Sequence, residues 1–290
     1  MKYMRNEPKF KPLEDINPGS HWTIPYRDFS PDEGSFDSVL LEEVDGFTLN
    51  NENPSSIREM MEIAQKQMKL RRSSGLETAL GIASGGECLL LGVLPYVPKV
   101  TGIDLGYSSI ASTAIKAEFI RTHKTHELRR VLERGEKYFA DLVDAELIHS
   151  IPADVVGRSL DSYKSIFTDH DSVKHTYLSE FNQFRFVWFS TPEEVFDRAR
   201  ENIMGLSLEH APITSDREKH DIAYASNTCD RRWTGNFGFL QAPSLLVSNL
   251  TKEGYLLTSH SISLLRRPFT KLVAQVTEDF WTYSLYRKTF

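Results

Sequence analysis

The sequence predicts an α/β protein with a mostly parallel sheet, a C-terminal antiparallel hairpin, an N-terminal extension and a helical insertion. Three features predict this class. A strand, a glycine turn, a helix and a second strand follow one another over residues 78–104. Apolar strand-like runs then alternate with helical segments up to residue 260. Residues 269–290 resemble two strands joined by a tight turn. Alternating strands and helices are typical of a parallel sheet with right-handed crossovers.

A helix is expected before the first strand, because Ser56 and Glu59 form a capping-box pattern. The apolar residues that follow share one helical face: Ile57, Met60, Met61, Ala64 and Met68. The first β/α units are then expected as strand 78–84 (TALGIAS), helix 87–94 (ECLLLGVL), strand 99–104 (KVTGID) and helix 108–123.

A long helical segment is expected to interrupt this alternation over about residues 121–182. The alternation resumes with strand 184–190 (FRFVWFS), helix 192–202, strand 220–226 (HDIAYAS), a helix within 230–249 and strand 254–260 (GYLLTSH). A tight turn at Glu278-Asp279 closes the final hairpin. We therefore divide the chain into an N-terminal extension or lid, residues 1–74, and a nucleotide-binding domain, residues 75–290.

The composition excludes several classes of function. The net charge is −6 and the pI is about 5.9, whereas a nucleic-acid binder would be basic and patchy. Two cysteines, Cys88 and Cys229, form neither a disulfide framework nor a zinc site, so no metal is expected. The apolar runs are too short for a membrane span, and the N-terminus lacks a signal-peptide core. A cytoplasmic protein with a small-molecule substrate is expected, and a homodimer stays open.

The turn after the first strand indicates which nucleotide the protein binds. Ser84-Gly85-Gly86 is followed by Glu87, instead of the third glycine of the dinucleotide fingerprint, and the P-loop lysine is missing. A carboxylate there would repel a pyrophosphate, but it could meet the ammonium of an amino acid. Asp104 ends the second strand, where a carboxylate can accept both ribose hydroxyls. Adenosine with an amino-acid tail and no phosphates is S-adenosylmethionine.

The ends of the predicted strands should share one crevice, because ligands of open α/β sheets bind outside the carboxyl ends of the strands. These ends are Ala83-Ser84, Asp104, Ser190 and Ser226-Asn227.

The segment "IASGGECLLLGVLP…VTGIDLGYSSIASTAIKAEF" carries a resemblance to known enzymes. The β/α units with their C-terminal hairpin resemble the class I S-adenosylmethionine-dependent methyltransferase fold. More narrowly, residues 75–260 resemble the betaine-lipid synthase-like 3-amino-3-carboxypropyltransferases. The resemblance rests on the Ser-Gly-Gly turn, the Asp at the second strand end, Lys116 on the next helix, the helical segment and "DIAYASN". Its smaller members include azetidine-2-carboxylate synthases.

This resemblance implies an enzyme that consumes S-adenosylmethionine at the γ-carbon of the methionyl group and releases methylthioadenosine. The form of this reaction that we expect is intramolecular cyclisation to azetidine-2-carboxylate, in which the cofactor's own amine is the nucleophile. The expected cofactor-binding residues are Ser84, Gly85, Gly86, Glu87, Asp104, Leu105, Ser190, Thr191 and Arg27. The expected catalytic residues are Asn227, Tyr107, Tyr26 and Ser226, with the tyrosines closing the site or facing the sulfonium.

Other functions stay open at this stage. The aminocarboxypropyl group could pass to an external small molecule or lipid, and ordinary methyl transfer would leave S-adenosylhomocysteine. A nicotianamine synthase-like condensation, a binding module without turnover, and a dehydrogenase are further alternatives, because many folds share a βαβ unit.

Overall fold

The computed structural model of the chain describes residues 26–28, 52–82, 86–104, 107–142, 184–211, 218–226, 244–259, 270–278 and 281–289. The strands are β1 (Tyr26–Asp28), β2 (Thr78–Ile82), β3 (Lys99–Asp104), β4 (Leu206–His210), β5 (His220–Tyr224), β6 (Leu250–Thr258), β7 (Thr270–Glu278) and β8 (Trp281–Lys288). The helices are α2 (Pro54–Lys69), α3 (Tyr107–Thr122), α4 (Thr125–Glu133), α5 (Glu136–Leu142) and α8 (Glu193–Asn202). A π-helix spans Cys88–Val93, and helical turns also cover 184–190 and 244–248.

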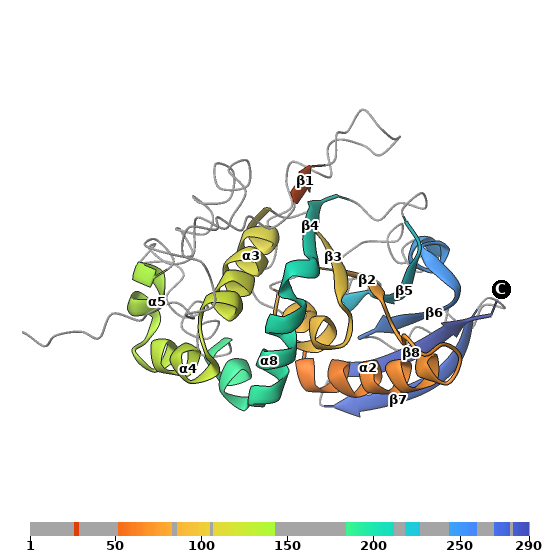
Figure 1. The fold of residues 1–290 in the computed structure, drawn as a ribbon, viewed down its shortest axis with the longest axis horizontal. Helices are drawn as coiled ribbons and strands as arrows, with labels where there is room; N and C mark the ends of the chain where they lie inside the picture. Colours follow the sequence, from red (N-terminus) through yellow and green to blue (C-terminus); the bar gives the residue numbers. More distant parts are fainter. Residues whose placement is uncertain are drawn as a thin grey trace, which may run out of the picture.

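Within the described residues, eight strands form one sheet in the order β1-β4-β3-β2-β5-β6-β8-β7 (Figure 1). Strands β1 to β6 pair in parallel, whereas β8 runs antiparallel between β6 and β7. The predicted C-terminal hairpin is therefore confirmed. The chain passes from β2 to β3 and β4 on one side, then crosses back to β5 on the other side. The switch point of the sheet consequently lies between β2 and β5.

Both faces of the sheet are buried, as the two-residue period of a strand requires. On β5, Ile222 and Tyr224 join the larger hydrophobic cluster, which includes α2, the π-helix and α3. Ala223 and Ala225 join the smaller cluster on the other face, together with Leu246. Helix α2 packs beside β7 and β8 (Figure 1), so this part of the N-terminal extension shares the core of the sheet.

Helix α2 begins three residues earlier than predicted. Asn53 is its N-cap and accepts a hydrogen bond from the backbone N–H of Ser55 at 2.9 Å, and Pro54 occupies the first turn. Ser56 therefore lies inside the helix, where its hydroxyl donates to Glu278 at the end of β7. The predicted apolar face of this helix is buried, as expected.

The predicted third strand, residues 184–190, is wrong, because this segment is helical. In a strand Phe184, Phe186 and Trp188 would share one face, but here Phe186 is 72% exposed. Phe184 and Trp188, four residues apart, are both buried, and Trp188 stacks on Phe119 with ring centroids 5.5 Å apart. A dense aromatic run was read with a period of two where the period is 3.6.

The actual third strand is β4, Leu206–His210. Its residues alternate strictly, with Leu206, Leu208 and His210 buried and the two polar residues between them half-buried. The strand is short and half polar, so it was not predicted from the sequence, whereas the more apolar run that precedes α8 was. The carboxyl end of the third strand is therefore His210, which corrects the position assigned to Ser190 and Thr191.

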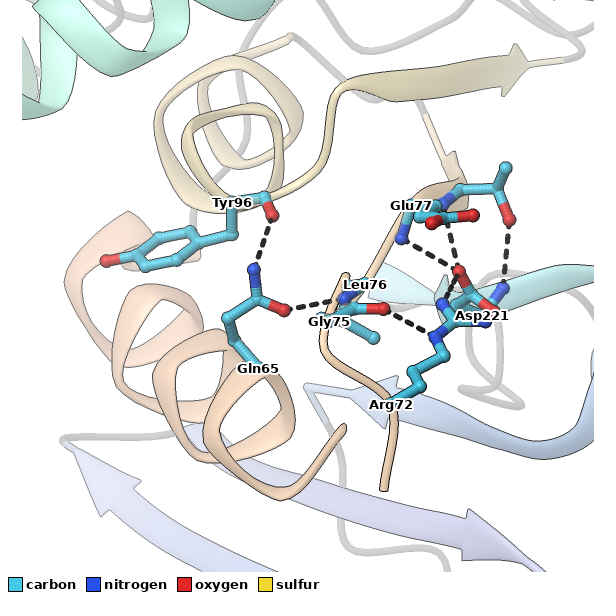
Figure 2. A network of polar contacts seen from close by, with 8 residues as sticks. Gln65, Arg72, Gly75, Leu76, Glu77, Tyr96 and Asp221 are labelled. Carbon is cyan, nitrogen blue, oxygen red and sulfur yellow. Dashed lines mark hydrogen bonds and ion pairs between the residues drawn. The ribbon is translucent and has the colours of Figure 1, made fainter. Parts of the chain in front are cut away.

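A polar network fixes the opposite, amino edge of the sheet (Figure 2). Asp221 is 2% exposed and accepts hydrogen bonds from the backbone N–H groups of Glu77 at 2.8 Å and Thr78 at 3.1 Å. Arg72 forms an ion pair with the same carboxylate and donates to the carbonyl of Gly75 at 2.6 Å. Gly75 has φ +73°, so the turn between α2 and β2 favours glycine. The network ties the end of α2 to the start of β2.

His123 at the end of α3 makes the stability of the fold depend on pH. It is 2% exposed beside the ring of Phe119, and burial lowers its pKa to about 4, with Arg200 acting in the same direction and Glu127 opposing it. The imidazole of His123 therefore binds a proton near pH 6.5 in the unfolded chain, but only near pH 4 in the folded chain. We expect a stabilisation of roughly 3 kcal/mol, present above pH 6.5 and lost as the pH falls to about 4.

This pH dependence can be measured by urea unfolding between pH 4 and pH 7.5. The variant His123→Gln should have a flatter dependence of the unfolding free energy on pH than the wild type. The exposed neighbour His126 provides the control, since His126→Gln should leave the slope unchanged. Equal slopes in all three proteins would contradict the assignment to His123.

Candidate functional site

The site lies at the carboxyl edge of the sheet, around the switch point between β2 and β5. Open α/β sheets bind ligands in this position because neighbouring loops diverge there and leave a crevice. Four described residues lie at the ends of the central strands or a few residues beyond them: Gly86, Asp104, Ser226 and Ser259. The predicted Ser226 and Asp104 therefore do share one edge of the sheet with the glycine turn.

The glycine turn packs tightly against helix α3. Gly86 has φ +87°, and a Cβ added to it would lie 3.0 Å from the Cα of Thr113. Its carbonyl, just before the π-helix, accepts from the N–H of Leu90 at 2.8 Å. Only glycine combines this backbone conformation with so close an approach. Ser84 and Gly85 lie outside the described residues.

Glu87 follows the turn and is buried in an ion pair with Lys116 of α3. Glu87 is 1% exposed and Lys116 is 3% exposed, and the lysine nitrogen also lies 5.1 Å from the centre of the Phe184 ring. A buried carboxylate is stabilised by such a partner. The role assigned to Glu87, binding the methionyl ammonium, stays a prediction, and the structure gives it Lys116 as one partner inside the protein.

Asp104 ends β3 as predicted. It lies in register with His210 of β4, and its carbonyl accepts from the backbone N–H of Ala211 at 3.0 Å. The side chain is half-buried, and its assigned role in binding the ribose stays a prediction. Leu105 lies outside the described residues. Tyr107 begins α3, but its side chain is outside the description.

Strand β1 brings part of the N-terminal extension to the same edge. It pairs with β4, with Tyr26 opposite Leu208 and Arg27 opposite Glu209. Because β4 neighbours β3, this segment lies on the Asp104 side of the switch point. The side chains of Tyr26 and Arg27 are not described, so their assigned roles stay predictions.

A buried carboxylate that the sequence did not reveal lies at the switch point. Glu52 is 2% exposed and accepts hydrogen bonds from Ser226 at 2.9 Å and Ser259 at 2.5 Å. The hydroxyl of Tyr224 donates to its other carboxylate oxygen. The carbonyl of Glu52 lies 3.6 Å from the sulfur of Cys88, just past the glycine turn. Glu52 therefore bridges the ends of β5 and β6 and the start of the π-helix.

The groups around Glu52 are held in their neutral forms. Burial raises the pKa of the Tyr224 hydroxyl well above its ordinary value, and the nearby Cys88 and Glu52 raise it further. Burial likewise raises the pKa of the Cys88 thiol, with Glu52 adding to the effect. Three hydroxyl donors suit an ionised carboxylate, which only accepts hydrogen bonds. The buried thiol of Cys88, with its raised pKa, is therefore not an activated nucleophile.

The segment that carries Glu52 is anchored to the C-terminal hairpin. The side chain of Asn53 donates to Glu278 at 2.8 Å, and its backbone N–H donates to the hydroxyl of Tyr283 at 2.6 Å. Ser226 has φ +46°, an uncommon conformation for a residue with a side chain. These features place the carboxylate and the serine hydroxyl over the end of β5. The expected catalytic Asn227 lies outside the described residues.

Ser190 and Thr191 close a helix and do not end a strand. Both hydroxyls donate to the carbonyl of Val187, at 3.0 Å and 2.7 Å, and the carbonyl of Thr191 accepts from Arg129 at 3.0 Å. Sequence reasoning placed them beside the adenine only because it placed the third strand there.

The described residues contain no group of three or more His, Cys, Asp or Glu side chains that could hold a metal ion. Among the described helices, none is long and apolar enough to cross a membrane.

Comparison with known proteins gives distant structural likenesses. No family model and no curated protein matches the sequence. Similar solved structures include the rRNA methyltransferase aviRa from Streptomyces viridochromogenes (TM-score 0.43, 12% identity, 88% of this chain and 94% of that chain). The N-methyltransferase NodS from Bradyrhizobium japonicum WM9, with S-adenosyl-L-homocysteine, is another (TM-score 0.39, 13% identity, 86% and 95%). A third is an rRNA methylase from Streptococcus thermophilus (TM-score 0.36, 9% identity, 83% and 99%).

The strand order decides the fold. The strands β4-β3-β2-β5-β6 run parallel in this order, and the antiparallel β8 lies between β6 and β7. This strand order is characteristic of a single fold class. The chain has the class I methyltransferase fold. The dehydrogenase alternative is thereby disfavoured, since its dinucleotide-binding sheet has the strand order 3-2-1-4-5-6 without such an insertion.

Proposed function

We propose that this protein is an enzyme that consumes S-adenosylmethionine at the γ-carbon and releases methylthioadenosine. The observation that carries the proposal is the placement of Gly86 four residues after β2 and of Asp104 at the end of β3, beside the switch point of a class I methyltransferase fold. A turn with a close backbone approach suits the amino-acid tail. A carboxylate at the neighbouring strand end suits the two ribose hydroxyls.

The choice of the γ-carbon rests on the resemblance to the 3-amino-3-carboxypropyltransferases, which Lys116 and the Ser-Gly-Gly turn share. Methyl and aminocarboxypropyl transfer start from one sulfonium and differ in which carbon meets the nucleophile in line. The tail must fold so that the γ-carbon, and not the methyl group, faces the nucleophile. We expect Ser226, just past the end of β5, to border that carbon, with Asn227 next to it in the sequence.

Intramolecular cyclisation is the form of this reaction that we propose. The methionyl amine, once neutral, attacks its own γ-carbon, and the carbon–sulfur bond breaks with its electron pair passing to sulfur. The products are methylthioadenosine, azetidine-2-carboxylate and one proton. No second substrate is required, so the site need only bend the tail and exclude water.

The test is to incubate the purified full chain with S-adenosylmethionine alone and to identify the products by mass spectrometry. We expect methylthioadenosine together with an amino acid of the mass of azetidine-2-carboxylate. Methylthioadenosine formed only when an acceptor is added would support transfer to an external molecule. S-adenosylhomocysteine as the product would contradict attack at the γ-carbon and indicate methyl transfer.

A further inference from the structure

We propose that the amino edge of the sheet, around the end of α2, binds the surface of an anionic lipid membrane. This surface lies opposite the carboxyl edge where S-adenosylmethionine is expected, so the inference goes beyond the proposed function. Helix α2 ends near the start of β7 and the end of β8 (Figure 1). The cations gathered there, all exposed or half-buried, form what we call the basic edge: Lys69, Arg71, Lys219, Lys271, Arg287 and Lys288.

Contacts across the strands join the cations near α2 into one surface. The guanidinium of Arg71 donates to the hydroxyl of Tyr255 at 3.2 Å and lies 6.0 Å from the centre of its ring. Arg287 of β8 lies in register with Tyr255 of β6, and Lys271 of β7 lies in register with Arg287. Three positive side chains from three different elements therefore lie next to one another.

Lys219 and Lys288 extend the basic edge towards β5. Lys288, the last residue of β8, donates to the carbonyl of Leu250 at 2.9 Å, and Lys219, just before β5, donates to the carbonyl of Ser248 at 2.6 Å. Partial burial lowers the pKa of Lys288, and the nearby charge of Lys219 lowers it further. Two ammonium groups that repel each other in this way gain from an anion placed beside them.

The charges of the basic edge are not neutralised by ion pairs. Within the described part of the chain, none of its six side chains pairs with a carboxylate, whereas the neighbouring Arg72 pairs with Asp221. The exposed carboxylates of Glu218 and Glu253 also lie at this edge. They are outnumbered by the cations, so the surface is locally positive in a chain with a net charge of −6.

An exposed leucine within the basic edge favours a lipid surface over other polyanions. Leu70 is 81% exposed and lies between Lys69 and Arg71 in the sequence. Cations bind the headgroups of an anionic membrane, and an apolar side chain among them enters the boundary of the acyl chains. A single-stranded nucleic acid instead stacks its bases on aromatic rings, and the ring of Tyr255 is fully buried.

Sedimentation of the full-length protein with lipid vesicles tests this proposal. The wild type should bind vesicles of equal parts phosphatidylglycerol and phosphatidylcholine, but not vesicles of phosphatidylcholine alone. Each cation beside an anionic membrane strengthens binding about fivefold, so the triple variant Lys69→Gln/Arg71→Gln/Lys271→Gln should bind about a hundredfold more weakly. Leu70→Ser should weaken binding about tenfold, because its apolar contact is lost.

The control is the triple variant Lys124→Gln/Arg130→Gln/Lys137→Gln. It removes three exposed cations at α4 and α5, away from the basic edge, and changes the net charge by the same amount. It should bind the anionic vesicles like the wild type. The thermal midpoint of each variant shows whether it is folded.

The outcomes are distinct. A wild type that does not bind anionic vesicles would overturn the proposal, as would equal losses in the two triple variants. Binding unchanged in Leu70→Ser would overturn the insertion of the leucine, and with it the choice of a lipid surface. Binding of polyuridine RNA in preference to vesicles, lost in the first triple variant, would assign the basic edge to nucleic acid instead. None of these outcomes depends on the reaction that the enzyme catalyses.

Discussion

Replacing Asp221 by alanine is expected to destabilise the protein by about 4 kcal/mol, a large part of the stability of a typical domain. The carboxylate accepts from the backbone N–H groups of Glu77 and Thr78 and pairs with Arg72 (Figure 2). Its loss leaves two donors and a guanidinium without their acceptor at the amino edge of the sheet. The helix α2 and the strand β2 would lose the connection that sets their relative position.

Urea unfolding followed by circular dichroism measures this effect. Asp221→Asn should cost less than Asp221→Ala, because an amide oxygen can still accept from the two backbone donors. Asp197→Ala is the control, since its ion pair with Arg200 involves a side chain that is 56% exposed, and exposed pairs contribute less than about 1 kcal/mol. A cost for Asp221→Ala as small as that of the control would mean that the network does not hold this edge.

The sequence was sufficient for the elements whose local pattern agrees with their place in the fold. The βαβ unit from β2 to α3 and the C-terminal hairpin are marked by glycine, by apolar periodicity and by turn residues, all within short stretches of chain. The prediction of the third strand was wrong because the aromatic run around Trp188 is more apolar than β4 and has the composition of a strand. Its helical period appears only in the burial of Phe184 and the exposure of Phe186.

The candidate site was predictable to the same degree. Asp104 ends β3, and Gly86 and Ser226 come shortly after β2 and β5, so the rule for carboxyl edges places them together. Glu52 follows no motif, because its three hydroxyl partners lie 172 to 207 residues away in the sequence. Such a contact exists only once the whole sheet is assembled. Its polar surroundings are likewise invisible in a sequence where Glu52 is one of many acidic residues before α2.

Changing Asp104 to asparagine is expected to weaken the binding of S-adenosylmethionine by about a hundredfold or more. Two ribose hydroxyls donate to this carboxylate in the proposed complex, and a hydrogen bond to a charged group contributes about 1.5–3 kcal/mol. An amide replaces one acceptor oxygen with a donor, so one hydroxyl loses its partner and both lose the charge. Calorimetric titration with S-adenosylmethionine and with methylthioadenosine measures the loss. The control Asp141→Asn changes an exposed carboxylate of α5 and should bind both ligands normally.

Asparagine is chosen because it separates ribose binding from helix capping. Asp and Asn are about equally good N-caps, so a carboxylate that only helps to start α3 would be replaced without loss. Unchanged affinity in Asp104→Asn would therefore show that Asp104 has a structural role alone. The pattern across ligands adds a second criterion, since both ligands contain the ribose and should weaken together.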